Sequence, residues 1–264
     1  MARKILITGG TSGIGLATAE ALSEKGHHVI ATGHTEADVA AMKEYVQSKN
    51  LPIDSFKLDI TQEADRKLIS NYQIDVLINC AGMGESGSLA EIPMDRLRKN
   101  FETNVFGTIA LCQEAFKQMI PRNSGTIVII SSLAGRSPRP FLGSYSTSKY
   151  VLSAAAAILK QELRYITKNV HVAVVEPGSY HTGYNQRMMQ NKYEWMGPDT
   201  SYFWNVRDKI EKAEQFMFKM TEYKSLNSIV AKIVRAAEAE NPRLRYVAPW
   251  WEGAIVQLSR IFGT

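Results

Sequence analysis

A tyrosine and a lysine stand four residues apart in the stretch Tyr145-Ser146-Thr147-Ser148-Lys149. On a helix this spacing puts both side chains on one face. A tyrosine near its reference pKa of about 10 is mostly protonated at neutral pH, and a neighbouring ammonium favours the phenolate. We therefore expect Lys149 to lower the pKa of Tyr145, so that the phenol can exchange a proton with a substrate oxygen.

The spacing alone is weak evidence, because Tyr45 and Lys49 form a second pair of the same kind. That pair precedes most of the predicted strands, and we interpret it as part of a helix surface. The neighbouring motifs must therefore decide which pair does chemistry.

A glycine-rich turn follows the first predicted strand, in the stretch Thr8-Gly9-Gly10-Thr11-Ser12-Gly13-Ile14-Gly15. Glycines let the backbone approach a pyrophosphate closely, and free N–H groups at a helix start receive its charge. The spacing Gly-x3-Gly-x-Gly differs from the commoner Gly-x-Gly-x2-Gly. The sequence predicts a nucleotide cradle whose contacts are Gly9, Thr11, Ser12, Gly13, Ile14 and Gly15.

The end of the second predicted strand bears on the choice of nucleotide. NAD sites usually place an acid there to bind the ribose 2′-hydroxyl. This chain has Gly33-His34-Thr35 instead, with no acid before Glu36. His34 could donate a hydrogen bond to a 2′-phosphate, helped by the hydroxyls of Thr11, Ser12 and Thr35. The sequence favours NADP and leaves NAD open, since no arginine is present; the alternative is that His34 only begins the next helix.

The elements that must position these residues alternate regularly between strands and helices. Near-continuous Val, Ile and Leu runs are typical of strands buried on both faces of a parallel sheet. The pattern predicts a doubly wound α/β sheet of the Rossmann type with about seven strands, in a single domain spanning 1–264. Strands are expected at 4–8, 28–32, 53–58, 75–79, 126–130, 170–175 and 245–247, and helices near 13–25, 35–48, 61–71, 89–120, 144–168 and 225–239.

One region breaks this rhythm. Residues 180–223 contain no predicted strand and are rich in aromatic residues and methionine. Long insertions in compact domains are usually lids or binding loops, so we expect a lid over a bulky apolar substrate. The alternative is ordinary helix packing, since such residues normally fill cores.

Composition and charge exclude several classes of protein. The net charge of +5 is mild, and no nucleic-acid recognition module is present. No apolar run is long enough to span a membrane, and no signal peptide is visible. Cys80 and Cys112 are too few for a disulfide scaffold or a zinc site, so we expect no metal and a cytoplasmic location.

Several motifs occur together in this chain, in a defined order and at characteristic spacing. They are the glycine-rich turn, Asn79-Cys80-Ala81-Gly82, Asn104-Val105-Phe106-Gly107, Ser131-Ser132, Tyr145 with Lys149, and Pro177-Gly178. In this combination, from Ile5 to about Thr182, the chain closely resembles the short-chain dehydrogenase/reductase family.

The resemblance implies a role for each matching residue. Tyr145 would be the acid/base, Lys149 would bind the nicotinamide ribose, and Ser132, rather than Ser131, would hold the substrate oxygen. Asn104 would support a water-mediated proton relay behind Lys149. The remaining cofactor contacts implied by the family are Asp59 and Ile60 near the adenine, Asn79, Ala81 and Gly82 along the cofactor, and Pro177, Gly178 and Thr182 at the nicotinamide end.

These expectations describe an NADP-dependent oxidoreductase that interconverts a ketone and a secondary alcohol, on a bulky apolar small molecule. The alternatives are an NAD-dependent alcohol dehydrogenase, a 3-oxoacyl reductase, or a cofactor-sensing binding protein. In the family that the chain resembles, the helices near 100–118 and 153–158 are the usual dimerising pair, and the small side chains here allow close helix approach. The resemblance therefore implies a homodimer or homotetramer.

Four further features carry more than one interpretation each. Arg136 and Arg139 would either attract an anionic substrate group or lie exposed in their loop. Glu176 would place an acid near the nicotinamide, or simply end its strand at the surface or in a hydrogen bond. The apolar tail 250–262 would pack on the pocket, join a partner subunit or touch a membrane.

Overall fold

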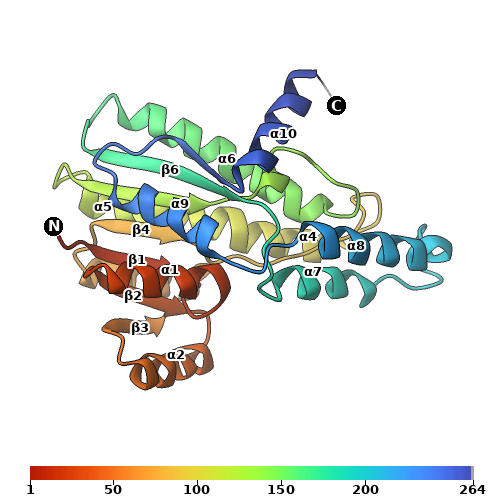
Figure 1. Ribbon diagram of the computed structural model, residues 1–264, viewed down its shortest axis with the longest axis horizontal. Helices are drawn as coiled ribbons and strands as arrows, with labels where there is room; N and C mark the ends of the chain where they lie inside the picture. Colours follow the sequence, from red (N-terminus) through yellow and green to blue (C-terminus); the bar gives the residue numbers. More distant parts are fainter. Residues whose placement is uncertain (263–264) are drawn as a thin grey trace.

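The computed structural model describes residues 1–262, which form a seven-stranded sheet in the order β3-β2-β1-β4-β5-β6-β7 (Figure 1). Every neighbouring pair of strands is parallel. The predicted doubly wound Rossmann-type sheet is therefore confirmed. The strands are β1 (Lys4–Thr8), β2 (His28–Gly33), β3 (Ile53–Lys57), β4 (Val76–Asn79), β5 (Gly125–Ile130), β6 (Val170–Pro177) and β7 (Arg245–Ala248).

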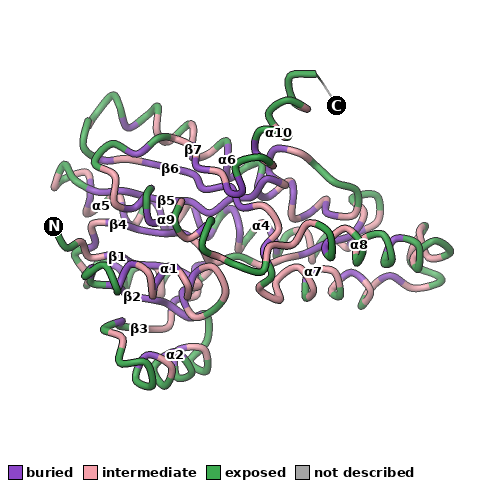
Figure 2. Tube along the Cα trace, viewed as in Figure 1, coloured by how far each residue is buried: buried purple, intermediate pink, exposed green. Residues whose placement is uncertain are grey.

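Helices cover both faces of the sheet, and Figure 2 shows the strands buried between them. Alternate side chains of a strand point to opposite faces. Thus Ile5 and Ile7 pack towards α1 and α9, whereas Leu6 packs towards α5 and α6. The helices are α1 (Gly13–Glu24), α2 (Glu36–Lys49), α3 (Glu63–Lys67), α4 (Met94–Phe101), α5 (Thr108–Met119), α6 (Gly143–Leu163), α7 (Tyr184–Tyr193), α8 (Arg207–Thr221), α9 (Asn227–Glu238) and α10 (Trp250–Phe262).

The chain order reverses between β1 and β4, which are neighbours in the sheet although β2 and β3 separate them in sequence. In open α/β sheets, ligands bind outside the carboxyl ends of the strands at such a switch point. The glycine-rich turn after β1 lies at this position.

The helix predicted for 89–120 is interrupted. A widened π-helical segment, η2 (Glu102–Gly107), separates α4 from α5. The Asn104 side chain accepts a hydrogen bond from the Met83 N–H (2.8 Å) and donates to the Met83 carbonyl (2.9 Å). These bonds tie the helix to the loop after β4, and π segments of this kind are frequent at functional sites.

Residues 180–223, the lid segment, project beyond the carboxyl ends of the strands (Figure 1). They form α7, the short η4 (Trp204–Val206) and α8, and an isolated bridge between Tyr180 and Tyr223 joins the two ends of the segment. A buried ion pair between Lys192 and Glu214 links α7 to α8. Within residues 1–262, no helix is both long and apolar enough to cross a membrane.

Candidate active site

The turn after β1 folds tightly because of its glycines. Gly9 and Gly13 have positive φ angles (62° and 52°), which side chains rarely tolerate. A Cβ on Gly15 would lie 2.2 Å from the Gly9 carbonyl oxygen, so that position accepts no side chain. Ser12 caps α1 without using its side chain for the cap, which leaves its hydroxyl and the first N–H groups of the helix available to an anion.

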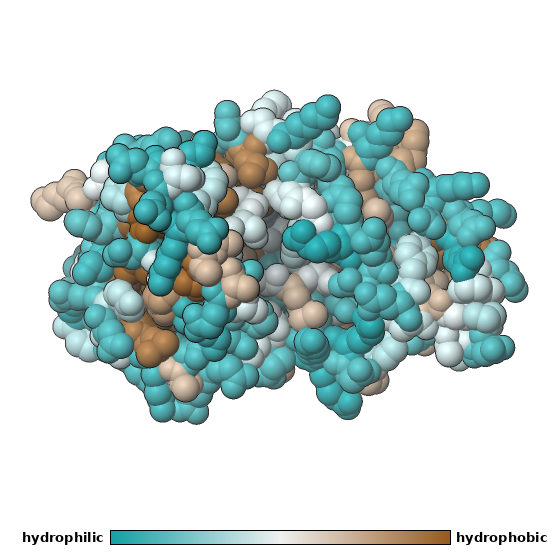
Figure 3. All heavy atoms as spheres, turned by 90° about the horizontal axis from the view of Figure 1, so that it is seen from below, coloured by the Kyte–Doolittle hydropathy of each residue, from teal (hydrophilic) through white to brown (hydrophobic). Residues whose placement is uncertain are grey.

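The ends of β1 and β4 are joined by the Thr8 hydroxyl. Its oxygen accepts hydrogen bonds from the N–H groups of Cys80 (3.1 Å) and Ala81 (3.0 Å). A Cβ on Gly9 would lie 2.9 Å from the Ala81 Cα, so the turn and the end of β4 approach closely. Together they form two walls of a groove, which we call the cofactor groove; Figure 3 shows the molecular surface hollowed near its middle.

Most residues predicted to contact the cofactor lie together in this groove. Those that line it are Gly9, Ser12, Gly13, Ile14, Gly15, Ala81, Gly82, Tyr145, Lys149, Pro177, Gly178 and Thr182. Two other predicted contacts, Asn79 and Ile60, have buried side chains: Asn79 donates to the Cys112 thiol (3.4 Å), and Ile60 belongs to the core. Neither residue is part of the lining of the groove.

The proposed 2′-phosphate site lies at the ends of β2 and β3. His34 is largely exposed, and its Nε2 lies 3.4 Å from Asp59 Oδ2. Burial raises the pKa of Asp59, but hydrogen bonds from Thr61 and the contact with His34 outweigh it and lower that pKa overall. The sequence did not reveal this acid beside His34, because Asp59 follows β3 and not β2.

Thr35 does not fit its predicted role. It is the N-cap of α2, where its hydroxyl donates to Asp38 Oδ2 (2.8 Å) and accepts from the Asp38 N–H (3.1 Å). This reciprocal capping box occupies the hydroxyl that was expected to hold a phosphate. The expectation is therefore wrong, and the phosphate contact would fall to His34, Thr11 and Ser12.

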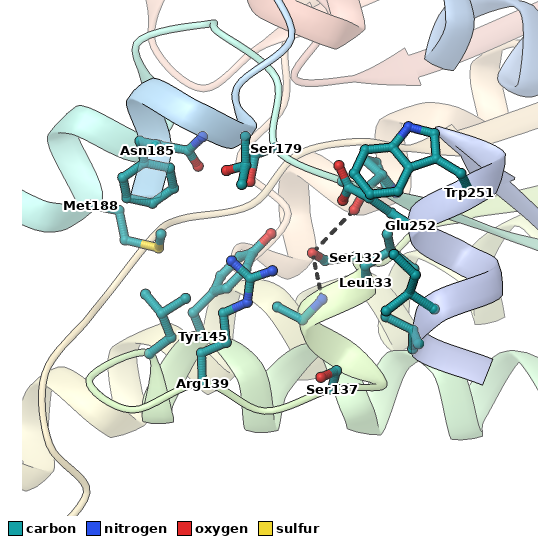
Figure 4. Close-up of a pocket in the computed structure, with 18 residues that line it drawn as sticks. Ser132, Leu133, Ser137, Arg139, Tyr145, Ser179, Asn185, Met188, Trp251 and Glu252 are labelled. Atoms are coloured by element: carbon teal, nitrogen blue, oxygen red, sulfur yellow. Dashed lines mark hydrogen bonds between the residues drawn. The ribbon is translucent and has the colours of Figure 1, made fainter. Parts of the chain in front are cut away.

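Tyr145 and Lys149 lie on the first turns of α6 and line the cofactor groove together with Ser132. Figure 4 shows Tyr145 and Ser132 in the adjoining pocket. The Lys149 Nζ lies 5.7 Å from the centroid of the Tyr145 ring and donates to the Ile130 carbonyl oxygen (2.9 Å). Ser132 Oγ accepts from the Ala134 N–H (3.1 Å) and donates to the Pro177 carbonyl (3.4 Å). A serine, a phenol and an ammonium thus converge at the ends of β5 and β6.

The choice of Ser132 over Ser131 has a structural reason. The Ser131 hydroxyl donates to the Lys149 carbonyl (2.9 Å) and is hydrogen-bonded to the Ser153 hydroxyl (2.9 Å), so it holds α6 against β5. Ser132 instead lines the cavity beside Tyr145.

The pKa values differ from the expectation for this pair. Burial raises the pKa of Tyr145 to about 12, although a hydrogen bond with Ser132 opposes the shift. Burial also lowers the pKa of Lys149 to about 8. The prediction that Lys149 brings the tyrosine pKa down is therefore wrong in this structure, because desolvation of the phenolate dominates. Tyr145 stays protonated at neutral pH and is suited to donating a proton.

Asn104 acts on the same region through its side chain. Besides its bonds to Met83, its amide donates to the Ser148 hydroxyl (3.2 Å), one residue before Lys149. A Cβ on Gly82 would lie 3.1 Å from Asn104 Oδ1 and 3.7 Å from Lys149 Nζ. Asn104 and Lys149 therefore flank the same glycine at the floor of the groove.

Sequence reasoning missed several residues that line the groove. Tyr180, Tyr184, Asn185 and Arg187 come from the start of the lid segment. The Tyr184 ring packs against that of Tyr145 at a tilt of 57°, with the centroids 6.0 Å apart. Arg187 brings a positive charge to a groove suited to phosphates. The only feature of the sequence that could have indicated these residues as cofactor contacts was their position close to Thr182.

A second cavity, which we call the substrate pocket, adjoins the groove and shares five lining residues with it. Ser132, Tyr145, Pro177, Gly178 and Asn185 line both. The other walls come from distant parts of the chain: Leu133, Ala134, Ser137, Arg139 and Leu142 near η3 (Leu133–Gly135), Ser179, Met188 from α7, Phe218 and Thr221 from α8, and Trp251, Glu252, Ile255 and Val256 from α10. The first interpretation of the tail, packing on the pocket, matches this arrangement.

Arg136 and Glu176 belong to a buried hydrogen-bond network, and neither residue lines the substrate pocket. Glu176 has no exposed surface and accepts from Ser153 (3.1 Å), Arg136 (3.5 Å) and Arg245. Arg136 is buried and also donates to Gln257 of α10. Neither interpretation of Arg136 holds. For Glu176, the interpretation as a hydrogen-bonded strand end is confirmed, and a surface position is excluded. Arg139 is exposed and lines the pocket.

Comparison with known families agrees with this geometry. The family model of short chain dehydrogenases matches residues 3–193, from β1 through α7. The chain belongs to the short-chain dehydrogenase family. The match covers every element that contributes to the cofactor groove and the residues predicted to be catalytic, and it ends before α8.

Two curated relatives span nearly the whole chain. The 3-ketodihydrosphingosine reductase of Bacteroides thetaiotaomicron is 31% identical over 245 residues, which are 91% of this chain and 86% of the relative. The NADPH-dependent 3-dehydrocapnine reductase of Ornithobacterium rhinotracheale is 29% identical over 258 residues, 93% of this chain and 87% of that protein. Family membership identifies the chain as an oxidoreductase that uses a nicotinamide cofactor.

Solved structures confirm the fold. A short-chain dehydrogenase/reductase from Burkholderia phymatum, in complex with NAD, superposes with a TM-score of 0.79. The alignment covers 98% of this chain and 93% of that one, at 19% identity.

Proposed function

We propose that this short-chain dehydrogenase is an NADPH-dependent reductase of long-chain or similarly bulky apolar ketones, with Tyr145 as the proton donor. The observation that carries the proposal is that Ser132 and Tyr145 line both cavities, so a carbonyl and a nicotinamide can meet there. Apolar side chains of α7, α8 and α10 line the part of the substrate pocket beyond these two residues.

The residues of the groove fit a dinucleotide. The turn at Gly9–Gly15 and the free start of α1 suit a pyrophosphate, and Arg187 adds a cation. The bound nicotinamide supplies the hydride to the carbonyl carbon. Ser132 would hold the carbonyl oxygen, and Tyr145 would give it the proton. The Lys149 ammonium would stabilise the charge that develops on this oxygen, and Asn104 would hold the floor of the groove in place.

Two observations support the reductive direction and the substrate class. The Tyr145 pKa of about 12 favours the protonated acid over the phenolate base. Both relatives are named as reductases of oxidised compounds, one a 3-keto and the other a 3-dehydro compound. The lid segment, α10 and the apolar pocket walls are compatible with substrates of that kind.

We expect the rate of ketone reduction to fall as the pH rises through about 8, the value to which burial lowers the Lys149 pKa. Lys149 is charged below this pH and neutral above it, so stabilisation of the developing alkoxide is lost on the alkaline side. A plot of log kcat/KM against pH should decline with a slope near −1 above this pKa. In Lys149→Arg the guanidinium stays charged, so any remaining activity should lack this decline. A flat wild-type profile up to pH 10 would contradict the assignment.

NADP preference rests on His34, which we expect to bind a 2′-phosphate. Titration of the protein with NADPH and with NADH, followed by nicotinamide fluorescence, should show tighter binding of NADPH. His34→Asp should lower the NADPH/NADH affinity ratio by at least tenfold, because the introduced carboxylate and that of Asp59 would then both repel the phosphate. His28→Asp, at the far end of β2, is the matched control and should leave the ratio unchanged. Tighter NADH binding by the wild type would overturn the cofactor preference.

A homo-oligomer and a cytoplasmic location complete the proposal. Exposed apolar side chains on the two helices predicted to pair, Phe106 in η2 and Ile158 on α6, support the oligomer.

A further inference from the structure

One carboxylate in the substrate pocket has no role in the steps above. Glu252, in the first turn of α10, lines the pocket wall opposite the lid segment. Its Oε1 is inaccessible to solvent and has no hydrogen-bond partner among residues 1–262. Burial raises the pKa of this carboxyl, although Arg139 and Tyr223 oppose the shift. A buried carboxylate oxygen without a partner is unfavourable, so its presence in a pocket needs a reason.

Glu252 lies beside the catalytic groups. A Cβ on Gly178 would lie 2.5 Å from Glu252 Oε2, so the carboxylate occupies the space that a side chain at this glycine would fill. Gly178 follows Pro177, whose carbonyl accepts the hydrogen bond from Ser132. Figure 4 shows Glu252 and Trp251 next to Ser132, on the opposite side of the pocket from Met188. A ligand held at Ser132 would therefore have its adjacent atoms near Glu252.

Within the described part of the chain, the charges around Glu252 leave it without an ion-pair partner. Arg139 is the other charged side chain that lines the pocket, and it contacts Met217 Sδ (3.0 Å). Arg136 is engaged by Glu176 and Gln257. The pocket thus offers one carboxylate close to the reacting carbonyl, surrounded by apolar groups such as Leu133, Ile255 and Val256.

We propose that Glu252 binds a protonated amine of the substrate, close to the carbonyl that Tyr145 and Ser132 hold. An ammonium supplies the charge opposite to that of the carboxylate lining the pocket, whereas an alkyl chain suits the apolar walls. The substrate class is therefore a long-chain amino ketone. This inference rests on the proposed function, because it names the substrate of the same site.

Binding tests the assignment without turnover. The full-length protein, saturated with NADP⁺, is titrated calorimetrically with octylamine and with 1-octanol at pH 7. The wild type should bind the amine at least tenfold more tightly than the alcohol. Glu252→Gln keeps the shape of the side chain and removes its charge, so it should abolish this preference and leave octanol binding unchanged. The control Ile255→Ala, on the same helix, should weaken both ligands equally.

Turnover tests the substrate class with a long-chain ketone, the same ketone with an adjacent amino group, and its N-acetyl derivative. The wild type should prefer the amino ketone by at least tenfold in kcat/KM, and Glu252→Gln should lose this preference mainly through KM. If the three ketones react equally, or if Glu252→Gln changes nothing, the assignment is overturned. If no ketone is reduced, the proposed function fails, and the calorimetric comparison still decides the role of Glu252. Thermal melts of both variants report whether they fold.

Discussion

Tyr145→Phe is expected to lower turnover about a thousandfold and to leave the dissociation constant of NADPH within about twofold of wild type. The substitution removes one oxygen, and the ring keeps its packing against Tyr184. Without the hydroxyl, no acid remains at the position where Ser132 would hold the carbonyl oxygen. Steady-state kinetics with a long-chain ketone, together with fluorescence titration of NADPH, separate the two effects.

Tyr184→Phe is the matched control for this experiment. It removes the hydroxyl of the neighbouring tyrosine, which also lines the cofactor groove but is not the predicted acid. Its turnover should stay within a fewfold of wild type. Wild-type turnover in Tyr145→Phe, or a similar loss in both variants, would rule out Tyr145 as the proton donor.

Gly15→Ala is expected to weaken NADPH binding between about tenfold and a hundredfold. The added Cβ would lie 2.2 Å from the Gly9 carbonyl oxygen and 2.9 Å from the Gly9 carbonyl carbon, and both atoms belong to the backbone. Because the backbone must shift, the turn opens and the N–H groups of α1 lose their alignment. Overpacking of this kind costs about 1–3 kcal/mol, and each 1.4 kcal/mol is a factor of ten in affinity.

Gly197→Ala, in the lid segment, is the control for the glycine substitution. The nearest atom to its added Cβ is the Thr200 hydroxyl at 3.0 Å, a side-chain atom, and Gly197 does not line the cofactor groove. NADPH binding should therefore be unaffected. If Gly15→Ala bound NADPH as tightly as wild type, the turn could not be the site of the pyrophosphate.

The sheet could be predicted from the sequence because its strands are buried on both faces and consist of apolar runs. The same regularity placed the residues that we propose to be catalytic, since Tyr145 and Lys149 follow β5 on one helix. The interruption at η2 could not be predicted, because it depends on hydrogen bonds between Asn104 and Met83, in a loop more than 20 residues away.

The predictions about the site that were wrong all depend on burial or on contacts between residues far apart in the sequence, which only the folded chain determines. The spacing of Tyr145 and Lys149 was correct, but the direction of the tyrosine pKa shift depends on desolvation by the folded chain. From the sequence, Arg136 is expected to be an exposed loop residue. In the structure it is buried and hydrogen-bonded to Glu176 of β6 and Gln257 of α10. Glu252 stands 107 residues from Tyr145 in sequence, so only the tertiary structure places the two in one pocket.

The attachment of α10 to the rest of the protein affects which part of a substrate the enzyme can recognise. Arg136 holds Gln257 in the middle of the helix, and the pocket residues of α10 precede this point. Beyond it, Leu258, Ile261 and Phe262 are exposed to solvent. Only the carbons of a substrate chain that lie beside the pocket residues of α10 would contact the protein there, and the carbons beyond them would lie in solvent. We therefore expect the enzyme to distinguish substrates by their polar head and to accept tails of many lengths.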